Sequence, residues 1–334
     1  MNIFFKNIYI LFMNLNFKQI ENFFREFITN KKSSNFYNFF ALFGFYYIGC
    51  KLIRSLYSFK KYFLTTDSNL KHKYGDDWVI ITGATDGIGK SFAKEFVKRG
   101  HKVLMIARNE SKAKQVVDEL TKIKSDALVE YIIYDLDKFY TDEDIKELEE
   151  KLSPYKEVSI LINNAGIGKM KSLVNLSNSE IRSLINVNMN SVTFLTKAII
   201  PKMNKNKKSL IVFSGSGLYK IKPAYSTVYS GTKCYLDGFM SCLSQEHDNI
   251  DFTYLEIGPV STNLNRSTGR SKISPDDYCS SAIKHIGKYE YSAGHLKHGL
   301  LMGVVLSNNL LLRSTRKIIK KGVEKMLNNN NINQ

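Results

Sequence analysis

Tyr229 and Lys233 are spaced so that they could move a proton together. Residues four positions apart on a helix lie on one face. The unperturbed pKa of tyrosine is about 10, and a neighbouring ammonium lowers it by stabilising the phenolate. The pair could therefore act as a general acid toward a reacting oxygen. The spacing alone is weak, because it also occurs at Tyr47, Tyr57 and Tyr134.

Other polar groups at the ends of apolar runs support this pair. Ser216 precedes Tyr229 by 13 residues and follows the apolar run 210–213. Ser214 is the alternative, since either serine could face the site. The segment Asn163–Gly166 ends another apolar run, and Asn188 lies within a long helical stretch. We choose Ser216 because of its 13-residue interval to Tyr229.

A glycine cluster follows the first apolar run of the regular part of the chain. Gly83, Gly87 and Gly89 lie between the expected strand 79–82 and an expected helix 87–99. Glycines at such a turn let the backbone approach a pyrophosphate, which then lies at the helix N-terminus. The spacing is Gly-x-x-x-Gly-x-Gly rather than Gly-x-Gly-x-x-Gly. Its place after a strand predicts a dinucleotide site.

The second expected strand, 103–107, is followed by Arg108. An acidic residue there would hold the ribose 2′-hydroxyl of NAD, whereas an arginine accommodates the 2′-phosphate of NADP. The alternative is a solvated surface arginine. The sequence predicts NADPH over NADH.

Together these motifs resemble the short-chain dehydrogenase/reductase family, over about residues 76–295. The order Thr82–Gly89, Asn163–Gly166, Ser216, Tyr229–Lys233 is the family's order. The resemblance implies that Tyr229 donates the proton and Lys233 also binds the nicotinamide ribose. It further implies that Ser216 hydrogen-bonds the substrate carbonyl and that Asn188 anchors a proton-relay water.

The resemblance also implies a set of NADPH contacts. Asp135 resembles the residue that meets the adenine, and 257–262 resembles a loop at the nicotinamide in which Ile257 replaces the usual proline. No metal site is expected. The cofactor contacts expected are Gly83, Thr85, Asp86, Gly87, Ile88, Gly89, Arg108, Asp135, Asn163, Ala165, Gly166, Tyr229, Lys233, Val260 and Thr262.

Within the family the chain resembles the endoplasmic-reticulum branch. The segments that carry this resemblance are Thr85–Ser91, Ser214–Gly217 and Phe239–Glu246. That branch comprises very-long-chain 3-oxoacyl-CoA reductases and 17β-hydroxysteroid dehydrogenases of types 3 and 12. The resemblance implies reduction of a long-chain 3-oxoacyl-CoA in fatty-acid elongation. A 17-ketosteroid or retinal-type reductase is the second hypothesis, and a non-enzymatic membrane-bound nucleotide sensor or scaffold is the third.

The elements expected around these motifs alternate between short apolar strands and helices. Repeated βα units predict an α/β fold, a Rossmann-type doubly wound parallel sheet covered by helices on both faces. We expect an anchor and basic linker at 1–75 and a catalytic domain at 76–296. We further expect an extension at 297–327 and a disordered Asn-rich tail at 328–334. The helices 179–204 and 228–247 resemble those that pair across family dimers.

The net charge of +17 lies in the two ends of the chain. Residues 1–75 hold 11 Lys/Arg and 3 Asp/Glu, and residues 297–334 hold 7 and 1, so the middle is nearly balanced. A nucleic-acid domain would concentrate basic residues on a folded element, so we expect no nucleic-acid partner. Basic flanks fit attraction to an anionic membrane face.

The N-terminal flank also carries 18 uncharged residues, Ser33–Cys50, which include eight Phe or Tyr. They predict a membrane anchor, spanning or interfacial, with a soluble amphipathic helix as the alternative. We therefore expect a membrane-lipid partner and the endoplasmic-reticulum membrane, with a cytosolic catalytic domain. The run Leu300–Leu312 is too short to span, and it predicts a membrane-lying or substrate-cap helix, or else a packed C-terminal helix.

Overall fold

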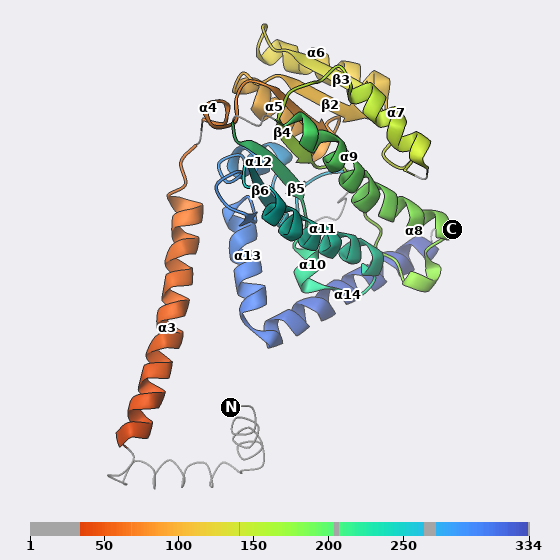
Figure 1. Ribbon diagram of the computed structural model, residues 1–334. Coiled ribbons are helices and arrows are strands. Elements are labelled where there is room, and N and C mark those ends of the chain that lie inside the picture. Colours follow the sequence, from red (N-terminus) through yellow and green to blue (C-terminus); the bar gives the residue numbers. More distant parts are fainter. Residues whose placement is uncertain (1–33, 68, 140, 204–206, 264–271, 333–334) are drawn as a thin grey trace. The chain divides into compact units, whose positions relative to one another are not determined.

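The computed structural model describes residues 34–67, 69–139, 141–203, 207–263 and 272–332 (Figure 1). The chain divides into two units, Met1–Leu64 and Thr65–Gln334. In the described part of the first unit, helix α3 (Ser34–Phe63) exposes large apolar side chains such as Phe45, Tyr46 and Ile53. No helix in the described ranges has both the length and the apolarity to cross a membrane.

The second unit is built on a parallel sheet. The described strands pair in the order β3-β2-β1-β4-β5-β6-β7, and each neighbouring pair is parallel. β1, β2, β4 and β5 are apolar and buried on both faces, the pattern of a sheet covered by helices. The predicted doubly wound α/β fold is confirmed. The strands are β1 (Trp78–Thr82), β2 (Val103–Ala107), β3 (Val129–Ile133), β4 (Val158–Asn163), β5 (Ser209–Ser214), β6 (Ile250–Leu255) and β7 (Tyr291–Ser292).

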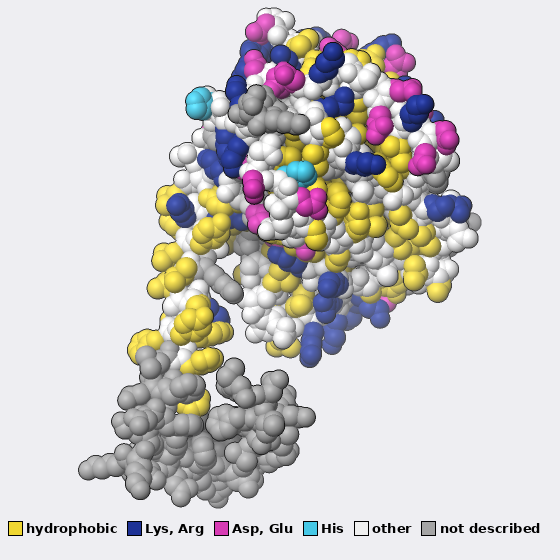
Figure 2. All heavy atoms as spheres, in the orientation of Figure 1, with side chains coloured by type: hydrophobic (Ala, Val, Ile, Leu, Met, Phe, Trp, Pro, Cys, Tyr) yellow, Lys and Arg dark blue, Asp and Glu magenta, His cyan; other side chains and the backbone are white. Residues whose placement is uncertain are grey.

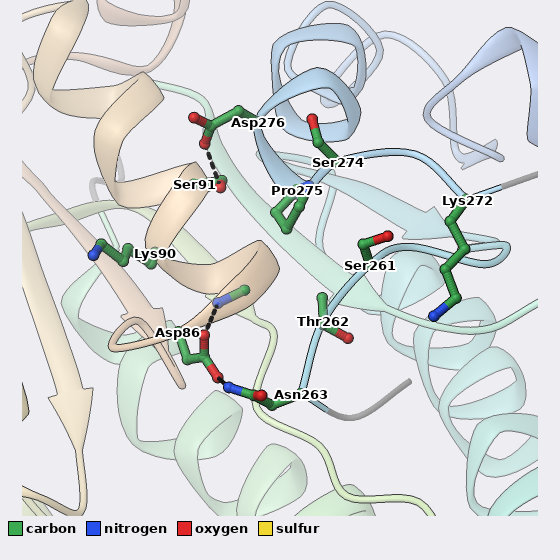
Figure 3. A pocket seen from close by; sticks show the side chains of 11 residues that line it. Asp86, Lys90, Ser91, Ser261, Thr262, Asn263, Lys272, Ser274, Pro275 and Asp276 are labelled. Atoms are coloured by element: carbon green, nitrogen blue, oxygen red, sulfur yellow. Dashed lines mark hydrogen bonds between the residues drawn. The ribbon is translucent and has the colours of Figure 1, made fainter. Parts of the chain in front are cut away.

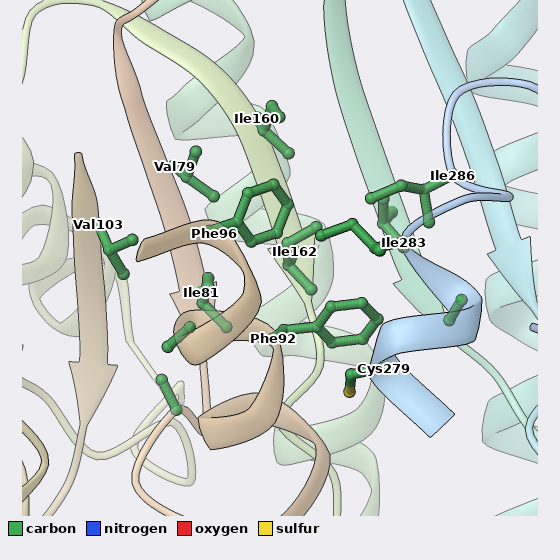
Figure 4. Close-up of a cluster of buried hydrophobic side chains, with 14 of the residues drawn as sticks. Val79, Ile81, Phe92, Phe96, Val103, Ile160, Ile162, Cys279, Ile283 and Ile286 are labelled. Atoms are coloured by element: carbon green, nitrogen blue, oxygen red, sulfur yellow. The ribbon is translucent and has the colours of Figure 1, made fainter. Parts of the chain in front are cut away.

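Helices cover both faces of this sheet (Figure 1). On one face, Phe92 and Phe96 of α5 fill the space between the sheet and Cys279 of α12 (Figure 4). The first face carries α5 (Gly87–Lys98), α6 (Glu110–Ile123) and α12 (Pro275–Ala282). The second carries α7 (Asp142–Leu152), α9 (Ser191–Ile199) and α11 (Thr227–Glu246). Burying each large apolar side chain stabilises the fold by about 1.5–3 kcal/mol.

The stretch expected as one helix, 179–204, is divided into shorter elements. α8 (Asn178–Ile185) passes into a π-helical turn, Asn186–Asn190, before α9 begins. A 3₁₀ turn with Pro201 in its first positions then ends the stretch. A π turn inserts one residue into the helical ladder, frequently at a functional site, and it has no signature in hydrophobic spacing.

The N-terminal boundary of the catalytic unit differs from the expected one. The compact unit begins at Thr65 rather than at residue 76. The reason is that the short helix α4 (Leu70–Tyr74) contributes two fully buried side chains, Leu70 and Tyr74, to the core. The Tyr74 hydroxyl donates a hydrogen bond of 2.8 Å to Asp251.

The C-terminal end also differs from the expected one. Helices α13 (Leu296–Ser307) and α14 (Asn309–Ile332) belong to the second unit. The expected disordered tail at 328–334 is wrong as far as Ile332, because α14 continues to that residue. Once a helix is nucleated, each further residue is added at little cost, so even an asparagine-rich end extends it. Residues 333–334 lie outside the described part.

Candidate active site

Tyr229 and Lys233 lie one turn apart near the start of α11, as predicted. The Lys233 ammonium lies 5.8 Å from the centre of the Tyr229 ring. Its Nζ donates a hydrogen bond of 2.8 Å to the main-chain oxygen of Ser214, at the end of β5. Lys233 is only 4% exposed, whereas Tyr229 is half-buried. The end of β5 thus fixes the lysine beside the Tyr229 ring.

Burial sets the pKa of both groups. Burial raises the pKa of Tyr229, and a hydrogen bond with the Ser216 side chain acts in the opposite direction but does not reverse it. The expectation that Lys233 lowers the tyrosine pKa is therefore not met, because desolvation outweighs other effects in the folded chain. Burial also lowers the pKa of Lys233 to about 8. Tyr229 thus carries its proton at neutral pH, as a proton donor requires.

The contacts of the two candidate serines differ. Ser216 shares a side-chain hydrogen bond with Tyr229, and its Oγ accepts one from the Leu218 N–H at 3.3 Å. Ser214 instead directs its Oγ to Asn164 Oδ1 at 3.4 Å and gives its main-chain oxygen to Lys233. This arrangement supports Ser216 as the serine that faces the reacting atoms.

Gly215, between the two serines, has no room for a side chain. A Cβ there would lie 2.1 Å from Cε1 of Tyr254. Tyr254 is fully buried, and its hydroxyl donates a hydrogen bond of 2.8 Å to the main-chain oxygen of Lys233. Tyr254 therefore ties β6 to the catalytic turn of α11. Sequence analysis missed this residue, because nothing local distinguishes it from the other tyrosines.

Asn188 lies in the π-helical turn and is fully buried. Its amide donates to the main-chain oxygen of Ile167 at 2.9 Å and to Thr232 Oγ1 at 3.1 Å. Its Oδ1 accepts from the Ile167 N–H at 2.9 Å. Asn188 thus joins the loop after β4 to α11, beside Lys233. Its water-anchoring role stays a prediction.

The three glycines after β1 form a tight turn. Gly83 and Gly87 have φ of +63° and +51°, a region that glycine adopts without strain. A Cβ on Gly89 would lie 2.3 Å from the Gly83 main-chain oxygen, so the helix packs closely against the turn. Asp86 caps α5, and its Oδ1 accepts a hydrogen bond of 2.7 Å from the Gly87 N–H.

Hydrogen bonds join the first residue of this motif to the loop after β4. Thr82 Oγ1 accepts hydrogen bonds from the N–H groups of Asn164 at 2.9 Å and Ala165 at 2.8 Å. Gly166 lies within reach of the catalytic groups, since a Cβ there would be 3.6 Å from Lys233 Nζ. Sequence analysis named Thr82 as the first residue of the glycine motif but did not identify these hydrogen bonds, because their partners lie 82 and 83 residues away.

Two predicted cofactor contacts in the glycine turn differ in environment. Thr85 is half-buried, at the outer bend. Ile88 packs against the core, and its main-chain oxygen accepts a hydrogen bond from the Cys279 thiol at 3.3 Å. Ile88 therefore packs between the turn and the core, and its contact with the cofactor stays a prediction.

The loop after β6 borders the glycine turn. Val260 is buried and bridges to Ile273. Thr262 lies against the turn, because a Cβ on Gly87 would be 3.0 Å from its Cγ2. Ile257, where the family usually has proline, donates its N–H to the Leu255 main-chain oxygen at 2.9 Å, a bond that proline could not make.

An open pocket of about 680 Å³ lies between the glycine turn and this loop. Figure 3 shows Asp86 on one side and Ser261, Thr262 and Asn263 on the other. Asn263 donates a hydrogen bond of 2.6 Å to Asp86 across it. The pocket therefore opens at the N-terminus of α5, where a phosphate would meet the helix dipole.

Arg108 and Asp135 follow β2 and β3 at the same edge of the sheet. Arg108 is exposed and makes no ion pair with the residues that the structure describes. Asp135 is half-buried, and its Oδ1 accepts the N–H of Asp137 at 3.1 Å.

Asn163, at the end of β4, is buried in the same region. Its amide donates to Thr196 at 3.0 Å, and its Oδ1 has no hydrogen-bond partner within the described part of the chain. Since a buried polar atom is costly when unsatisfied, this oxygen is suited to a bound donor. This oxygen and the glycine turn fit a dinucleotide, whose ribose hydroxyls and pyrophosphate need such partners.

Fold and site together define a dinucleotide-binding α/β protein. Residues 77–272 match the family model described as short chain dehydrogenase. The chain belongs to this family of oxidoreductases.

Named relatives and solved structures agree with this family. The very-long-chain 3-oxoacyl-CoA reductase of Macaca fascicularis is 35% identical over 243 residues, 70% of this chain and 75% of the relative. The Caenorhabditis elegans protein named "Putative steroid dehydrogenase 2" is 31% identical over 261 residues, 75% of this chain and 82% of the relative. A short-chain dehydrogenase from Sphingobium yanoikuyae, solved with NADPH, has a TM-score of 0.57 at 25% identity, covering 62% of this chain and 83% of that one.

Proposed function

We propose that the protein reduces long- or very-long-chain 3-oxoacyl-CoA to 3-hydroxyacyl-CoA with NADPH, as a step of fatty-acid elongation. The observation that carries this proposal is the meeting of Tyr229, Ser216 and Lys233 next to the loop that packs on the glycine turn. The oxoacyl-CoA substrate is supported by the name of the 35% identical relative.

The chain's own residues supply the proton and hold the substrate oxygen. NADPH, when bound, supplies the hydride to the carbonyl carbon. The Ser216 hydroxyl donates a hydrogen bond to the carbonyl oxygen, and Tyr229 transfers its phenolic proton to that oxygen as negative charge develops. The Lys233 ammonium lies beside the ring, where its charge would offset part of the desolvation cost of the phenolate that remains.

The choice of NADPH rests on Arg108, which is exposed at the end of β2. Its guanidinium can pair with the 2′-phosphate. We expect Arg108→Ala to raise the KM for NADPH at least about tenfold while the KM for NADH changes little, since a charged hydrogen bond contributes about 1.5–3 kcal/mol. Equal efficiency of the unmodified enzyme with NADH and NADPH would contradict the assignment.

One experiment separates the three functional hypotheses. NADPH oxidation by the purified full chain is measured with a series of 3-oxoacyl-CoA thioesters and, in parallel, with estrone. The proposal predicts turnover of long-chain thioesters. Turnover of estrone alone would favour the steroid alternative, which the C. elegans relatives' names support. NADPH binding without oxidation of any ketone would indicate a sensor.

We also propose that the enzyme works at the endoplasmic-reticulum membrane with its catalytic unit in the cytosol. Support comes from the exposed aromatic side chains of α3 and from the basic residues that end it, Lys60 and Lys61. Localisation of a fluorescent fusion, with protease protection of microsomes, checks both the membrane and the side.

Two kinds of protein partner belong to the same proposal. A homodimer through α9 and α11 is expected from the resemblance to family dimers, and elongation enzymes are the expected pathway partners. Analytical ultracentrifugation of the detergent-solubilised full chain tests this prediction. A homodimer would have a protein mass twice that of the 38.3 kDa monomer.

A further inference from the structure

Helix α13 has two different faces. His298, Met302 and Val305 are buried against the catalytic unit. Leu300, Leu301 and Val304, on the opposite side, are 58%, 44% and 58% exposed. Three exposed aliphatic side chains on one side of a helix are not required by packing within the described chain.

The apolar surface continues across the bend at Asn308 into α14. Leu310 and Leu311, in the first turn of α14, are 70% and 43% exposed. Leu312, next to them, packs instead with Ile221, Met302 and Val305. The bend is therefore fixed from inside by a small core, and it presents five large aliphatic side chains outward. We call Leu300, Leu301, Val304, Leu310 and Leu311 the leucine surface.

Basic side chains border the leucine surface along α14. Figure 2 shows Lys and Arg side chains gathered at the edge of the catalytic unit where Figure 1 places this helix. The exposed cations are Arg313, Lys317, Lys320, Lys321 and Lys325. The acidic residue of this segment, Glu324, accepts a hydrogen bond of 3.0 Å from Tyr225 and lies 3.7 Å from Lys320.

We propose that the leucine surface and the cations of α14 dock the catalytic unit on an anionic lipid bilayer. Aliphatic side chains enter the acyl boundary while lysines meet phosphate headgroups, as in helices that lie in the membrane interface. Each lysine near such a surface contributes about 1 kcal/mol. This charge complementarity favours anionic lipid over a second copy of the chain, whose own surface would place like charges together.

The helix that carries part of the leucine surface, α13, packs next to the catalytic serine. Met302 packs on Gly217, where a Cβ would be 2.8 Å from its Sδ, and Gly217 follows Ser216. His298, on the same helix, accepts the Gly258 N–H at 3.2 Å and donates to the Pro259 oxygen at 3.2 Å. Docking through α13 would therefore bring the site next to the bilayer. The lipid contact does not depend on the proposed reaction.

The test uses tryptophan placed in the full chain and lipids brominated on their acyl chains. Leu301→Trp reports the leucine surface, and Leu128→Trp, at an equally exposed leucine (45%) before β3, is the matched control. The single native tryptophan, Trp78, packs edge-on against Tyr155 and gives a constant background. With phosphatidylcholine–phosphatidylserine vesicles we expect the emission of the Leu301→Trp protein to shift to the blue and to be quenched. The emission of the Leu128→Trp protein should be unchanged.

A charge-reversal pair, added to Leu301→Trp, separates anionic lipid from other occupants. Lys317→Glu with Lys321→Glu should abolish most of the quenching, whereas Lys112→Glu with Lys122→Glu on α6 should not. The proposal would be overturned if the Leu301→Trp protein showed no quenching. It would also be overturned if vesicles of pure phosphatidylcholine quenched this protein as strongly as vesicles that contain phosphatidylserine. A concentration-dependent blue shift without vesicles would overturn it too, because that shift would show a second copy on the surface. NADPH oxidation by the same variants reports the proposed reaction separately.

Discussion

Lys233 links the stability of the site to its chemistry. Its ammonium is buried at the end of β5 and beside the Tyr229 ring, and it satisfies the Ser214 main-chain oxygen. A buried ammonium loses hydration, which makes its charged form less stable. Buried groups with a shifted pKa of this kind are common at active sites.

The residues that sequence motifs identify are those whose spacing is local, Tyr229 and Lys233. Tyr254 and His298 were not identified, because their partners lie far away in the chain.

The lowered pKa of Lys233 predicts a falling limb in the pH–rate profile. Burial lowers this pKa to about 8, so the ammonium is lost as pH rises through about 8. We expect kcat/KM for ketone reduction to fall above that pH, since kcat/KM reports groups of the free enzyme. Lys233→Arg keeps its charge throughout this range and should remove the limb, at a lower rate. A limb that persists unchanged in Lys233→Arg would contradict the assignment.

At the scale of elements, strands β1 to β6 and most helices follow from the sequence, whereas the short strand β7 and the interruptions of the helices do not. Short apolar strands before the glycine turn and before Asn163 predict the sheet edge that carries the site. The π turn at Asn186–Asn190 was missed, because Asn188 is held there by contacts to Ile167 and Thr232 rather than by any local preference. The last turns of α14 were missed because asparagine-rich composition was read as disorder.

The glycine turn gives an element-scale prediction. Gly89→Ala places a Cβ 2.3 Å from the Gly83 main-chain oxygen, so the start of α5 must move away from the turn. We expect NADPH affinity, measured by fluorescence titration, to fall at least about tenfold, equivalent to about 1.4 kcal/mol. Gly238→Ala, in α11, is the control, because its Cβ meets nothing within 4 Å and helix propensity favours alanine. Equal NADPH affinity of both variants would contradict the role of the turn.

Across the whole molecule, charge and stability are distributed unevenly. The excess of basic residues lies outside the nearly neutral segment 76–296. The core, by contrast, holds buried groups that oppose folding when charged. His101 is 2% exposed, and its two ring nitrogens have no hydrogen-bond partner within the described residues.

Acid should destabilise the fold through His101. Burial lowers its pKa to about 4 from the ordinary 6.5. Between these values the unfolded chain binds the proton and the folded chain does not, so stability falls as pH drops from 6.5 toward 4. We expect urea unfolding of His101→Leu to show a smaller loss over this range, by about 2–3 kcal/mol. The exposed His72→Leu is the control, and an equal pH dependence in all three proteins would contradict the explanation.

The central claim is that Tyr229 donates the proton in an NADPH-dependent ketone reduction. The direct measurement pairs NADPH oxidation with NADPH binding in Tyr229→Phe, which keeps the ring and removes the hydroxyl. The account predicts that turnover of a 3-oxoacyl-CoA falls by about 10²–10⁴-fold, as expected for loss of a general acid, while the Kd for NADPH stays nearly unchanged. A Tyr229→Phe enzyme with a near-normal rate would contradict it.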